Sequence, residues 1–461
     1  MVKSTLTQKT ENRTMLTDLY QLTMNAVYYD SKKNGTATFD LFVRKLPQDW
    51  GFLIVNGVED AIDYATNISF DDEDIEYLRG QELFSEDYLG HLRGFKFTGE
   101  IRAIKEGTPV SANTPILSVT APREEAQLLE TMLLNTINFQ TMVASKANRI
   151  FQAAYPAAVV DFGLRRAQDK DASMKGARAA YIGGAIATSN VLAGKEYGIP
   201  VNGTQAHSSV MSFDSELEAF RAYVKTFPNK PRLLIDTYDT LQGARNATVV
   251  AKEMEKEGRM FGGVRLDSGD LAQLSIQVRK ILDDAGLGHV EIDPKYARIF
   301  ATNDLNEYKI KELRDRGARI DGYGVGTEMI TGKPIAAIPG VYKLVEDEDG
   351  PKIKLSSGKK SHPGKKQVYR IEKEGRYLND VLALEREEIE GSPLLESVVR
   401  NGERIMPRRG LNEIREYCLR EVSKLPEHAL GVYVEKPYEI NESEGLKNLV
   451  SRLTKHYEVG K

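Results

Sequence analysis

Two short segments of the chain carry residues whose types and spacing suit group-transfer chemistry. His207 lies in the segment 203–208 (GTQAHS) and is one of six histidines in the chain. An imidazole can act as a general base, a ligand or a phosphoryl acceptor, although a single histidine more often has a structural role. Asp236 and Asp239 follow in the segment 234–239 (LIDTYD). Either carboxylate could orient the imidazole and fix its tautomer, or could instead cap a helix.

A third segment, 264–271 (VRLDSGDL), places Arg265 and Asp267 two residues apart. On a strand this spacing puts both side chains on the same face. A guanidinium suits a carboxylate or a phosphate, and a carboxylate suits a ribose hydroxyl or magnesium. Ser268 and Asp270 could contribute to the same site or could cap the following helix.

Two further segments could hold a flat anion and a phosphate. Phe162 and Arg165, in 161–166 (DFGLRR), combine an aromatic face with a cation; the alternative is a core phenylalanine beside solvated arginines. Gly324 and Gly326, in 324–327 (GVGT), would let backbone N–H groups approach a phosphate. Glycine-rich turns are common, so this motif alone is weak evidence.

These residues follow apolar segments that read as short strands. Each segment ends in a polar, charged or glycine-rich group, and the expected strands are 158–162, 199–202, 233–235, 264–266, 299–301 and 322–325. Helical patterns lie between them, at 214–226, 241–257, 271–285 and 307–316. Repeated strand–turn–helix units predict parallel strands in an α/β barrel or an open sheet. The strand ends of a barrel line one mouth, where catalysis occurs.

The pattern divides the chain into four parts. Residues 1–14 are expected to be a flexible tail. Residues 15–135 are expected to form a helical and β-rich domain, 136–340 the α/β barrel, and 341–461 a C-terminal domain that packs on the N-terminal one. Helices are predicted at 15–30, capped by Thr17 or Asp18, and at 122–154.

Composition narrows the class of protein. The chain has 461 residues, 28% charged and 41% hydrophobic, with a formal net charge of −4, which is usual for a soluble globular protein and unlike a nucleic-acid binder. Cys418 is its one cysteine, so no disulfide can form within the chain. The polar first fourteen residues and the small-residue stretch 177–194 predict neither a secretory signal nor a membrane span. We therefore expect a cytoplasmic protein.

Taken together, the motifs resemble those of the nicotinate phosphoribosyltransferase family. The resemblance lies in their order as well as their content: TDLYQLTM (17–24), DFGLRR (161–166), ATSNVLAG (187–194), GTQAHS (203–208), LIDTYDTL (234–241), VRLDSGDL (264–271) and YGVGTEM (323–329). It implies an irregular α/β barrel, a split β-rich N-terminal domain, a small C-terminal domain, and a homodimer with the active site at the subunit interface.

The resemblance also implies a reaction. Nicotinate, phosphoribosyl pyrophosphate, ATP and water would give nicotinate mononucleotide, pyrophosphate, ADP and phosphate, the first step of NAD salvage from nicotinate. An ATP-coupled ligase of this kind would pass through a phosphorylated His207, with Asp236 orienting the imidazole. Magnesium would lie near Asp267, which would also contact ribose hydroxyls.

The remaining site residues are assigned by the same resemblance. Tyr20 of the neighbouring protomer and Phe162 would enclose the pyridine, and Arg265 with Arg165 would hold its carboxylate. The other expected substrate contacts are Ser189 and Asn190 near the pyridine substituent, Gly324, Gly326 and Thr327 at the 5′-phosphate, and Thr204, Ser268 and Asn303.

The choice of acid over amide rests on charge. The related nicotinamide-using enzymes carry an aspartate where this chain has 188–190 (TSN), and an aspartate would repel a carboxylate. The alternatives are a nicotinamide phosphoribosyltransferase, a quinolinate phosphoribosyltransferase, a non-catalytic protein that binds phosphoribosyl pyrophosphate, or a barrel enzyme acting on another sugar phosphate.

Overall fold

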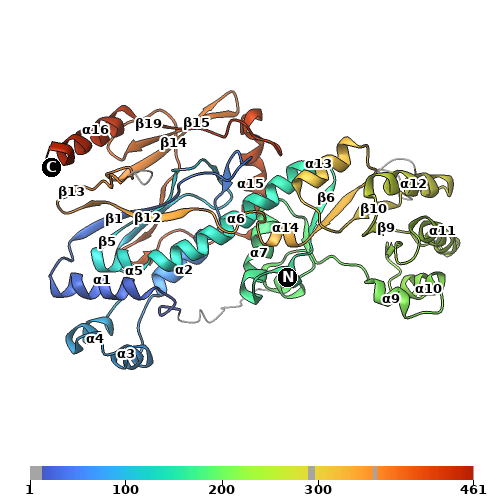
Figure 1. Ribbon diagram of the computed structural model, residues 1–461, viewed down its shortest axis with the longest axis horizontal. Helices are drawn as coiled ribbons and strands as arrows, with labels where there is room; N and C mark the ends of the chain where they lie inside the picture. Colours follow the sequence, from blue (N-terminus) through green and yellow to red (C-terminus); the bar gives the residue numbers. More distant parts are fainter. Residues whose placement is uncertain (1–12, 289–295, 357–360, 460–461) are drawn as a thin grey trace. The chain divides into compact units, whose positions relative to one another are not determined.

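The computed structural model describes residues 13–288, 296–356 and 361–459, which form two compact units. The β-rich unit comprises Met1–Met142, Ala337–Ala429 and Glu435–Lys461. The half-barrel unit comprises Val143–Ala336 and Leu430–Val434. The first unit is thus assembled from both ends of the chain, whereas the second is nearly continuous (Figure 1).

The half-barrel unit is built on six parallel strands. They are β6 (Ala158–Asp161), β7 (Ala187–Thr188), β8 (Arg232–Leu234), β9 (Gly263–Leu266), β10 (Arg298–Ala301) and β11 (Gly322–Val325). Their order in the curled sheet is β7-β6-β11-β10-β9-β8, and every pairing is parallel. The α/β class expected from the sequence is confirmed. The strand expected at 199–202 is instead a single bridge between Val201 and Thr188.

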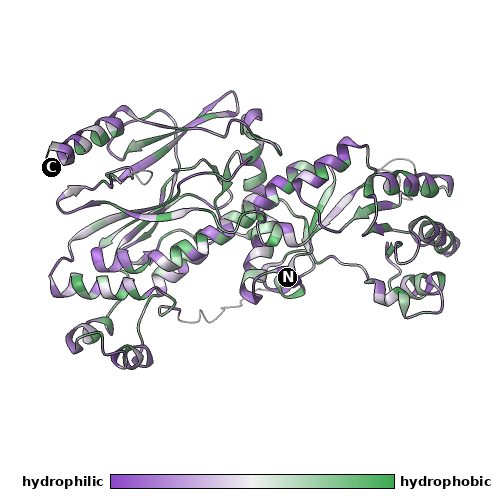
Figure 2. Ribbon diagram, in the orientation of Figure 1, coloured by the Kyte–Doolittle hydropathy of each residue, from purple (hydrophilic) through white to green (hydrophobic). Residues whose placement is uncertain are grey.

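Helices join these strands. They are α7 (Lys170–Gly183), α8 (Val191–Tyr197), α9 (His207–Met211), α10 (Glu216–Thr226), α11 (Thr240–Lys256), α12 (Leu271–Asp284), α13 (Glu307–Asp315) and α14 (Thr327–Ile330), with a 3-10 turn at Leu164–Arg166. Their ribbons alternate hydrophilic and hydrophobic residues (Figure 2), as expected where one face packs on a sheet and the other meets water. Leu233, Leu234 and Val264 are fully buried in the sheet.

The β-rich unit contains a seven-stranded sheet, whose order is β13-β12-β1-β5-β3-β17-β18. Its strands are β13 (Gly350–Pro351), β12 (Gly340–Asp347), β1 (Thr36–Val43), β5 (Pro115–Pro122), β3 (Glu100–Ala103), β17 (Glu396–Arg400) and β18 (Glu403–Arg404). β1 pairs on one side with β5 and on the other with β12. Strands from the two ends of the chain therefore share one sheet.

Two smaller sheets complete this unit. One has the order β16-β14-β15-β19, with bounds Ser392–Pro393, Lys366–Lys373, Arg376–Leu384 and Ile440–Glu442. The other pairs β2 (Leu53–Ile54) with β4 (Pro109–Val110). The helices are α1 (Leu19–Asp30), α2 (Val58–Asn67), α3 (Asp72–Arg79), α4 (Glu86–Leu92), α5 (Arg123–Leu128), α15 (Leu411–Ser423) and α16 (Glu444–Val459).

Helix predictions near the N-terminus need two corrections. The helix expected at 122–154 is split into α5 and α6 (Glu130–Ala154), and residues of α6 belong to both units. The helix expected at 15–30 begins at Leu19. Asp18 occupies its N-cap position, but its carboxylate makes no capping bond and accepts instead from the hydroxyl of Thr131 at 2.8 Å.

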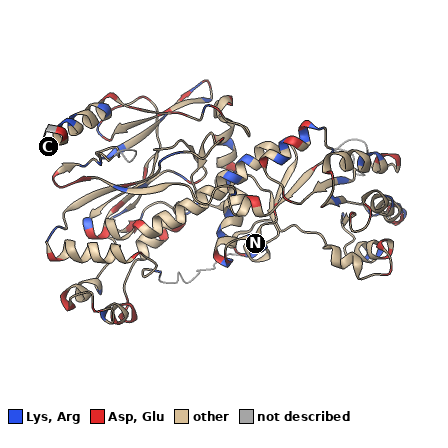
Figure 3. Cartoon of the chain, in the orientation of Figure 1, with Lys and Arg blue, Asp and Glu red and all other residues tan. Residues whose placement is uncertain are grey.

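Acidic and basic residues are interspersed along the ribbon of each unit (Figure 3). This mixture fits the small net charge. Among the described residues, no helix is both long and apolar enough to span a bilayer.

Candidate active site

Most of the predicted site residues lie where strands of the half-barrel end. Asp236 follows β8, Asp267 follows β9, Asn303 follows β10, and Phe162 follows β6. In parallel α/β folds the carboxyl ends of the strands carry the ligand-binding loops. The sheet therefore gathers side chains that are up to about 140 residues apart in the sequence (Phe162 to Asn303).

His207 is the first residue of α9, and its ring is held from two sides. Its Nδ1 lies 3.2 Å from Oγ1 of Thr237, and its Nε2 lies 3.4 Å from Oδ2 of Asp267. The imidazole is 38% exposed, so a substrate can reach it. A carboxylate beside Nε2 favours the tautomer in which Nε2 carries the proton, which leaves Nδ1 with a free electron pair.

The expected contact between Asp236 and His207 is wrong, because Asp236 is committed elsewhere. Its Oδ2 accepts from the backbone N–H of Asp267 at 2.7 Å and from the hydroxyl of Ser268 at 2.7 Å. The side chain is turned toward the β9 loop and is buried. Asp236 therefore holds the loop that carries Asp267.

Asp239 and Asp270 take the helix-capping roles that the sequence left open. Asp239 accepts from the backbone N–H of Gln242 at 2.7 Å and begins α11. Asp270 accepts from the first-turn amides of α12 and also pairs with Arg316. Both carboxylates therefore have structural roles at the start of a helix.

Arg265 and Asp267 face the same side of β9, as their spacing predicts. Nη2 of Arg265 lies 3.2 Å from Oδ1 of Asp267. Nη1 donates to the Thr204 hydroxyl at 2.9 Å and to the Gln205 carbonyl at 3.1 Å, and Nε donates to Thr302 at 3.0 Å. The guanidinium thus ties β9 to the loop that carries His207.

Asp267 is held as an anion. Burial alone would raise its pKa, but the hydrogen bond from Thr302, the charge of Arg265 and the contact with His207 outweigh burial and lower the pKa below its usual value. A permanently charged Asp267 can stabilise an imidazolium, or any positive charge that develops at His207.

Phe162 lies against a glycine of the neighbouring strand. A Cβ on Gly324 would stand 2.5 Å from the Phe162 ring and 2.7 Å from a methyl carbon of Thr302. A Cβ on Gly326 would meet the backbone carbonyl of Phe162 at 3.0 Å. Phe162 itself is half-buried. Both glycines therefore have a packing reason to be glycine, besides any phosphate that they could bind.

The segment 187–190 is held beside the end of β6. Thr188 donates to Oδ2 of the buried Asp161 at 2.7 Å, and burial raises the pKa of Asp161. Asn190 is buried and caps α8 by accepting from the backbone N–H of Ala193 at 3.1 Å. Ser189 is half-exposed. Asn190 therefore has a structural role that the sequence did not reveal.

The loops after β9 and β10 border an open hollow of about 540 Å³. Asn303, Asp304 and Asp270 are among its lining residues. Asn303 and Asp304 have φ values of 87° and 44°, a left-handed conformation that is uncommon outside glycine and often occurs at functional sites. The hollow is large enough for a small-molecule ligand.

A divalent cation could bind here only with help from its substrate. No three His, Cys, Asp or Glu side chains of the described ranges come together as a ready metal site. Both oxygens of Asp267 have protein partners, whereas Oδ1 of Asp236 is buried without a hydrogen-bond partner among the described residues. Magnesium would thus take most of its ligands from substrate oxygens and water.

Two other predicted residues are exposed. Arg165 is exposed in the 3-10 turn after β6, and the structure gives it no contact with Arg265. Tyr20 is on α1 of the β-rich unit and is 48% exposed. Thr237 and Thr302 were missed by the sequence analysis. The sequence indicated them only by their position, because each follows an apolar strand and is adjacent to a predicted site residue.

Comparison with known proteins gives a consistent result along the chain. Residues 15–138 match the nicotinate phosphoribosyltransferase N-terminal domain, 157–334 match the nicotinate phosphoribosyltransferase family, and 389–450 match the nicotinate phosphoribosyltransferase C-terminal domain. Nicotinate phosphoribosyltransferase pncB2 of Mycobacterium tuberculosis is 42% identical, over 89% of this chain and 87% of the relative.

Two further proteins agree with this match. Nicotinate phosphoribosyltransferase of Bacillus subtilis is 45% identical, over 83% of this chain and 78% of the relative. The crystal structure of human nicotinic acid phosphoribosyltransferase superposes with a TM-score of 0.83 and 27% identity, over 95% of this chain and 99% of that one.

Proposed function

The chain belongs to the nicotinate phosphoribosyltransferase family and transfers a phosphoribosyl group to nicotinate, and we propose that it couples this transfer to ATP through a phosphorylated His207. The observation that supports the coupling is the ring of His207 held between Thr237 and Asp267. A partly exposed imidazole with one nitrogen free of its proton is a suitable phosphoryl acceptor.

The proposed phosphoryl transfer needs only ATP, the imidazole of His207 and water. The electron pair of Nδ1 attacks the γ-phosphorus of ATP, a P–N bond forms, and the P–O bond to ADP breaks. The ring then carries a proton on Nε2, which faces the Asp267 carboxylate. Water later attacks the phosphorus, and phosphate leaves as the P–N bond breaks. Asp267, ionised because its pKa is lowered, stabilises the positive ring throughout.

The phosphoribosyl transfer needs positioning more than covalent chemistry. The pyridine nitrogen attacks C1 of the ribose as the bond to pyrophosphate breaks, and charge develops on the ribose ring. The half-buried Phe162 offers the pyridine a face. Arg265, with Arg165 as a second cation, would hold the nicotinate carboxylate. Alignment of the two reactants and fixed charges would supply most of the rate.

Phosphoribosyl pyrophosphate would occupy the loops at the ends of β9, β10 and β11. Gly324, Gly326 and Thr327 would receive the 5′-phosphate, with backbone N–H groups as donors. Asn303 lines the hollow, and Ser268 lies in the loop after β9. Magnesium, held by pyrophosphate oxygens beside Asp236 or Asp267, would neutralise the charge of the leaving group.

We also propose that the protein is a homodimer in which Tyr20 of one subunit completes the site of the other. Large apolar side chains are exposed on α1, where Leu19 is 53% and Val27 59% accessible. On the half-barrel unit Val191 and Leu192 of α8 are also exposed. Exposed apolar side chains of this kind are typical of a surface that is covered by another subunit.

One experiment tests the ATP coupling and the substrate together. Formation of nicotinate mononucleotide from nicotinate and phosphoribosyl pyrophosphate would be followed with magnesium, with and without ATP, for the native protein and His207→Ala. Nicotinamide would be run in parallel, and Ser208→Ala would be the control for the same loop. We expect ATP to increase the yield only where His207 is present. Equal stimulation of His207→Ala by ATP would contradict the phosphohistidine, and product from nicotinamide alone would reassign the substrate.

A further inference from the structure

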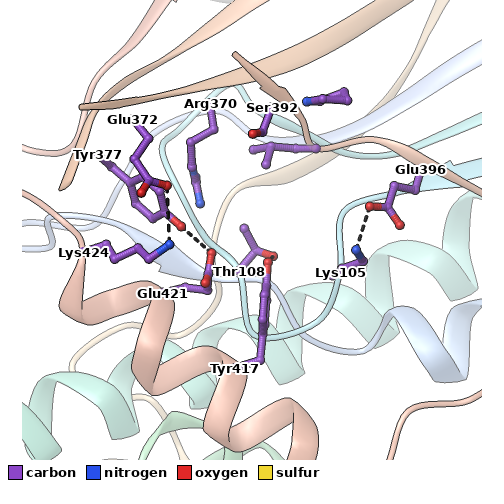
Figure 4. A pocket seen from close by; sticks show the side chains of 12 residues that line it. Lys105, Thr108, Arg370, Glu372, Tyr377, Ser392, Glu396, Tyr417, Glu421 and Lys424 are labelled. Atoms are coloured by element: carbon purple, nitrogen blue, oxygen red, sulfur yellow. Dashed lines mark hydrogen bonds and ion pairs between the residues drawn. The ribbon is translucent and has the colours of Figure 1, made fainter. Parts of the chain in front are cut away.

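A second pocket, of about 260 Å³, lies wholly within the β-rich unit. Strands β14 and β15 and helix α15 form its walls, and the loop between β3 and β4 contributes its floor (Figure 4). The unit holds none of the half-barrel residues that form the candidate active site. The proposed reaction gives this pocket no role.

Arg370 is the fixed centre of the pocket. Its Nε and Nη2 donate to Asp380 at 2.9 and 2.8 Å, and Nη2 also donates to the carbonyl of Pro109 at 2.6 Å. The rings of Tyr377 and Tyr438 flank the guanidinium at 4.6 and 5.5 Å. The side chain is 3% exposed, yet Nη1 has no hydrogen-bond partner among the described residues. A buried donor without an acceptor is costly, so an acceptor at this point would be stabilising, although the side chains beside Nη1 must move to admit one.

A hydroxyl on the floor is also available. Oγ1 of Thr108 and the hydroxyl of Tyr417 share one hydrogen bond of 3.2 Å. Whichever of the two donates, the hydrogen of the other remains for a further acceptor. Figure 4 shows Arg370 extending from its strand toward these two residues. The groups left over in this pocket are therefore donors.

Each of the three carboxylates that line the pocket already has a partner, in the pairs Lys105–Glu396 at 2.7 Å, Lys424–Glu372 at 3.4 Å and Tyr377–Glu421 at 2.5 Å. The cations Lys105, Arg370 and Lys424 face these three carboxylates, and Asp380 is bonded to Arg370 as well. Four carboxylates beside three cations leave a small negative excess, which disfavours a doubly charged phosphate more than a singly charged carboxylate that accepts from the free donors.

We propose that this pocket binds a small monocarboxylate, whose oxygens accept from Nη1 of Arg370 and from the free hydroxyl of the Thr108–Tyr417 pair. The volume is below the roughly 300–1,000 Å³ of pockets for drug-sized ligands, which limits the ligand to a compact acid. Pro393, Leu394 and the tyrosine rings of the lining provide surface for an apolar or aromatic body.

Hydrogen exchange of the full-length protein tests this site directly, with benzoate as the probe. We expect benzoate to slow exchange in residues 104–110 and 411–424, which line the pocket, and inorganic phosphate at the same concentration to leave both segments unchanged. The double variant Thr108→Val, Tyr417→Phe removes both hydroxyls of the pair and keeps the ring. It should raise the half-saturating benzoate concentration about tenfold, as for one hydrogen bond to a charged group.

Tyr77→Phe is the matched control, because Tyr77 is exposed on α3 of the same unit and does not line the pocket. Ser392→Phe, on the exposed β16 at the pocket, should abolish the protection by occupying the space. The site would be overturned if benzoate left both segments unprotected, or if the double variant Thr108→Val, Tyr417→Phe bound benzoate as the native protein does. A response to phosphate and none to benzoate would overturn the monocarboxylate.

Discussion

Oγ1 of Thr237 lies 3.2 Å from Nδ1 of His207, on the opposite side of the ring from Asp267. Because Asp267 is an anion, Nε2 is the nitrogen that carries the proton, and the Thr237 hydroxyl donates to Nδ1. In the proposed phosphorylation of His207, the hydroxyl that orients Nδ1 must release this nitrogen when phosphorus approaches. Thr237 is thus a positioning residue with two demands on its side chain, a hydroxyl and freedom to rotate.

Replacement of Thr237 by valine should lower the ATP-dependent part of the rate about tenfold, because the ring loses one of its two hydrogen bonds, worth about 1 kcal/mol or somewhat more. Thr237→Ser should restore most of that rate, since serine keeps the hydroxyl. The rate without ATP serves as the internal control and should change little. A valine variant with the full ATP effect would show that Asp267 alone positions the ring.

The ionised state of Asp267 predicts a dependence of stability on pH. Its pKa in the folded protein lies below that of the unfolded chain, so its contribution to stability is complete above the unfolded pKa of about 3.9. That contribution is lost as the pH falls through the folded pKa. Denaturant titrations should therefore show Asp267→Asn less stable than the native protein at pH 6. The difference should shrink at pH values below about 4, where a constant gap would contradict the lowered pKa.

Substitution of Gly324 by alanine should displace the Phe162 ring, because the new methyl group would stand 2.5 Å from it. We expect a loss of about 1–3 kcal/mol in the free energy of unfolding, as for other overpacked sites, together with a raised KM for nicotinate. Gly90→Ala is the matched control, because a Cβ at Gly90 meets nothing within 4 Å. An unchanged KM would show that Phe162 does not contact the pyridine.

Asn190→Asp separates the capping role of this position from its charge. Aspartate caps a helix about as well as asparagine, so the melting temperature should stay within a few degrees. If the side chain lies near the nicotinate carboxylate, the new charge should weaken nicotinate binding by a factor of about ten. Steady-state kinetics with nicotinate and with nicotinamide would distinguish the two substrates. An unaltered KM for nicotinate would limit Asn190 to its structural role.

Much of the half-barrel could be predicted from the sequence, because its strands are short apolar runs that each end in polar residues. Arg265 and Asp267 illustrate this: their spacing predicted a shared face, and the 3.2 Å contact confirms it. The conformation of the segment 199–202 was harder to predict from the sequence. Its apolar residues suit a strand, but only Val201 forms a bridge, because strand length depends on how the neighbouring chain continues.

The partner of His207 could not be predicted in the same way. Asp236 and Thr237 are adjacent in the sequence and point to different neighbours, and the direction of each depends on the turn after β8. A carboxylate is the commoner partner of an imidazole, which favoured Asp236 by type. The loop of β9 supplies two donors to that carboxylate, so the hydroxyl takes its place. Which of the two adjacent side chains contacts His207 depends on the tertiary structure around the turn after β8.

The position of β1 between β5 and β12 bears on how the protein is made. A ribosome completes residues 36–43 of β1 about 300 residues before residues 340–347 of β12 exist. Until then one edge of β1 exposes unpaired N–H and C=O groups, which can pair with another chain. Residues 143–336 of the half-barrel unit are synthesised during this interval and can fold first. The β-rich unit is therefore begun first and finished last, and the unpaired edge of β1 could pair with another chain during that interval.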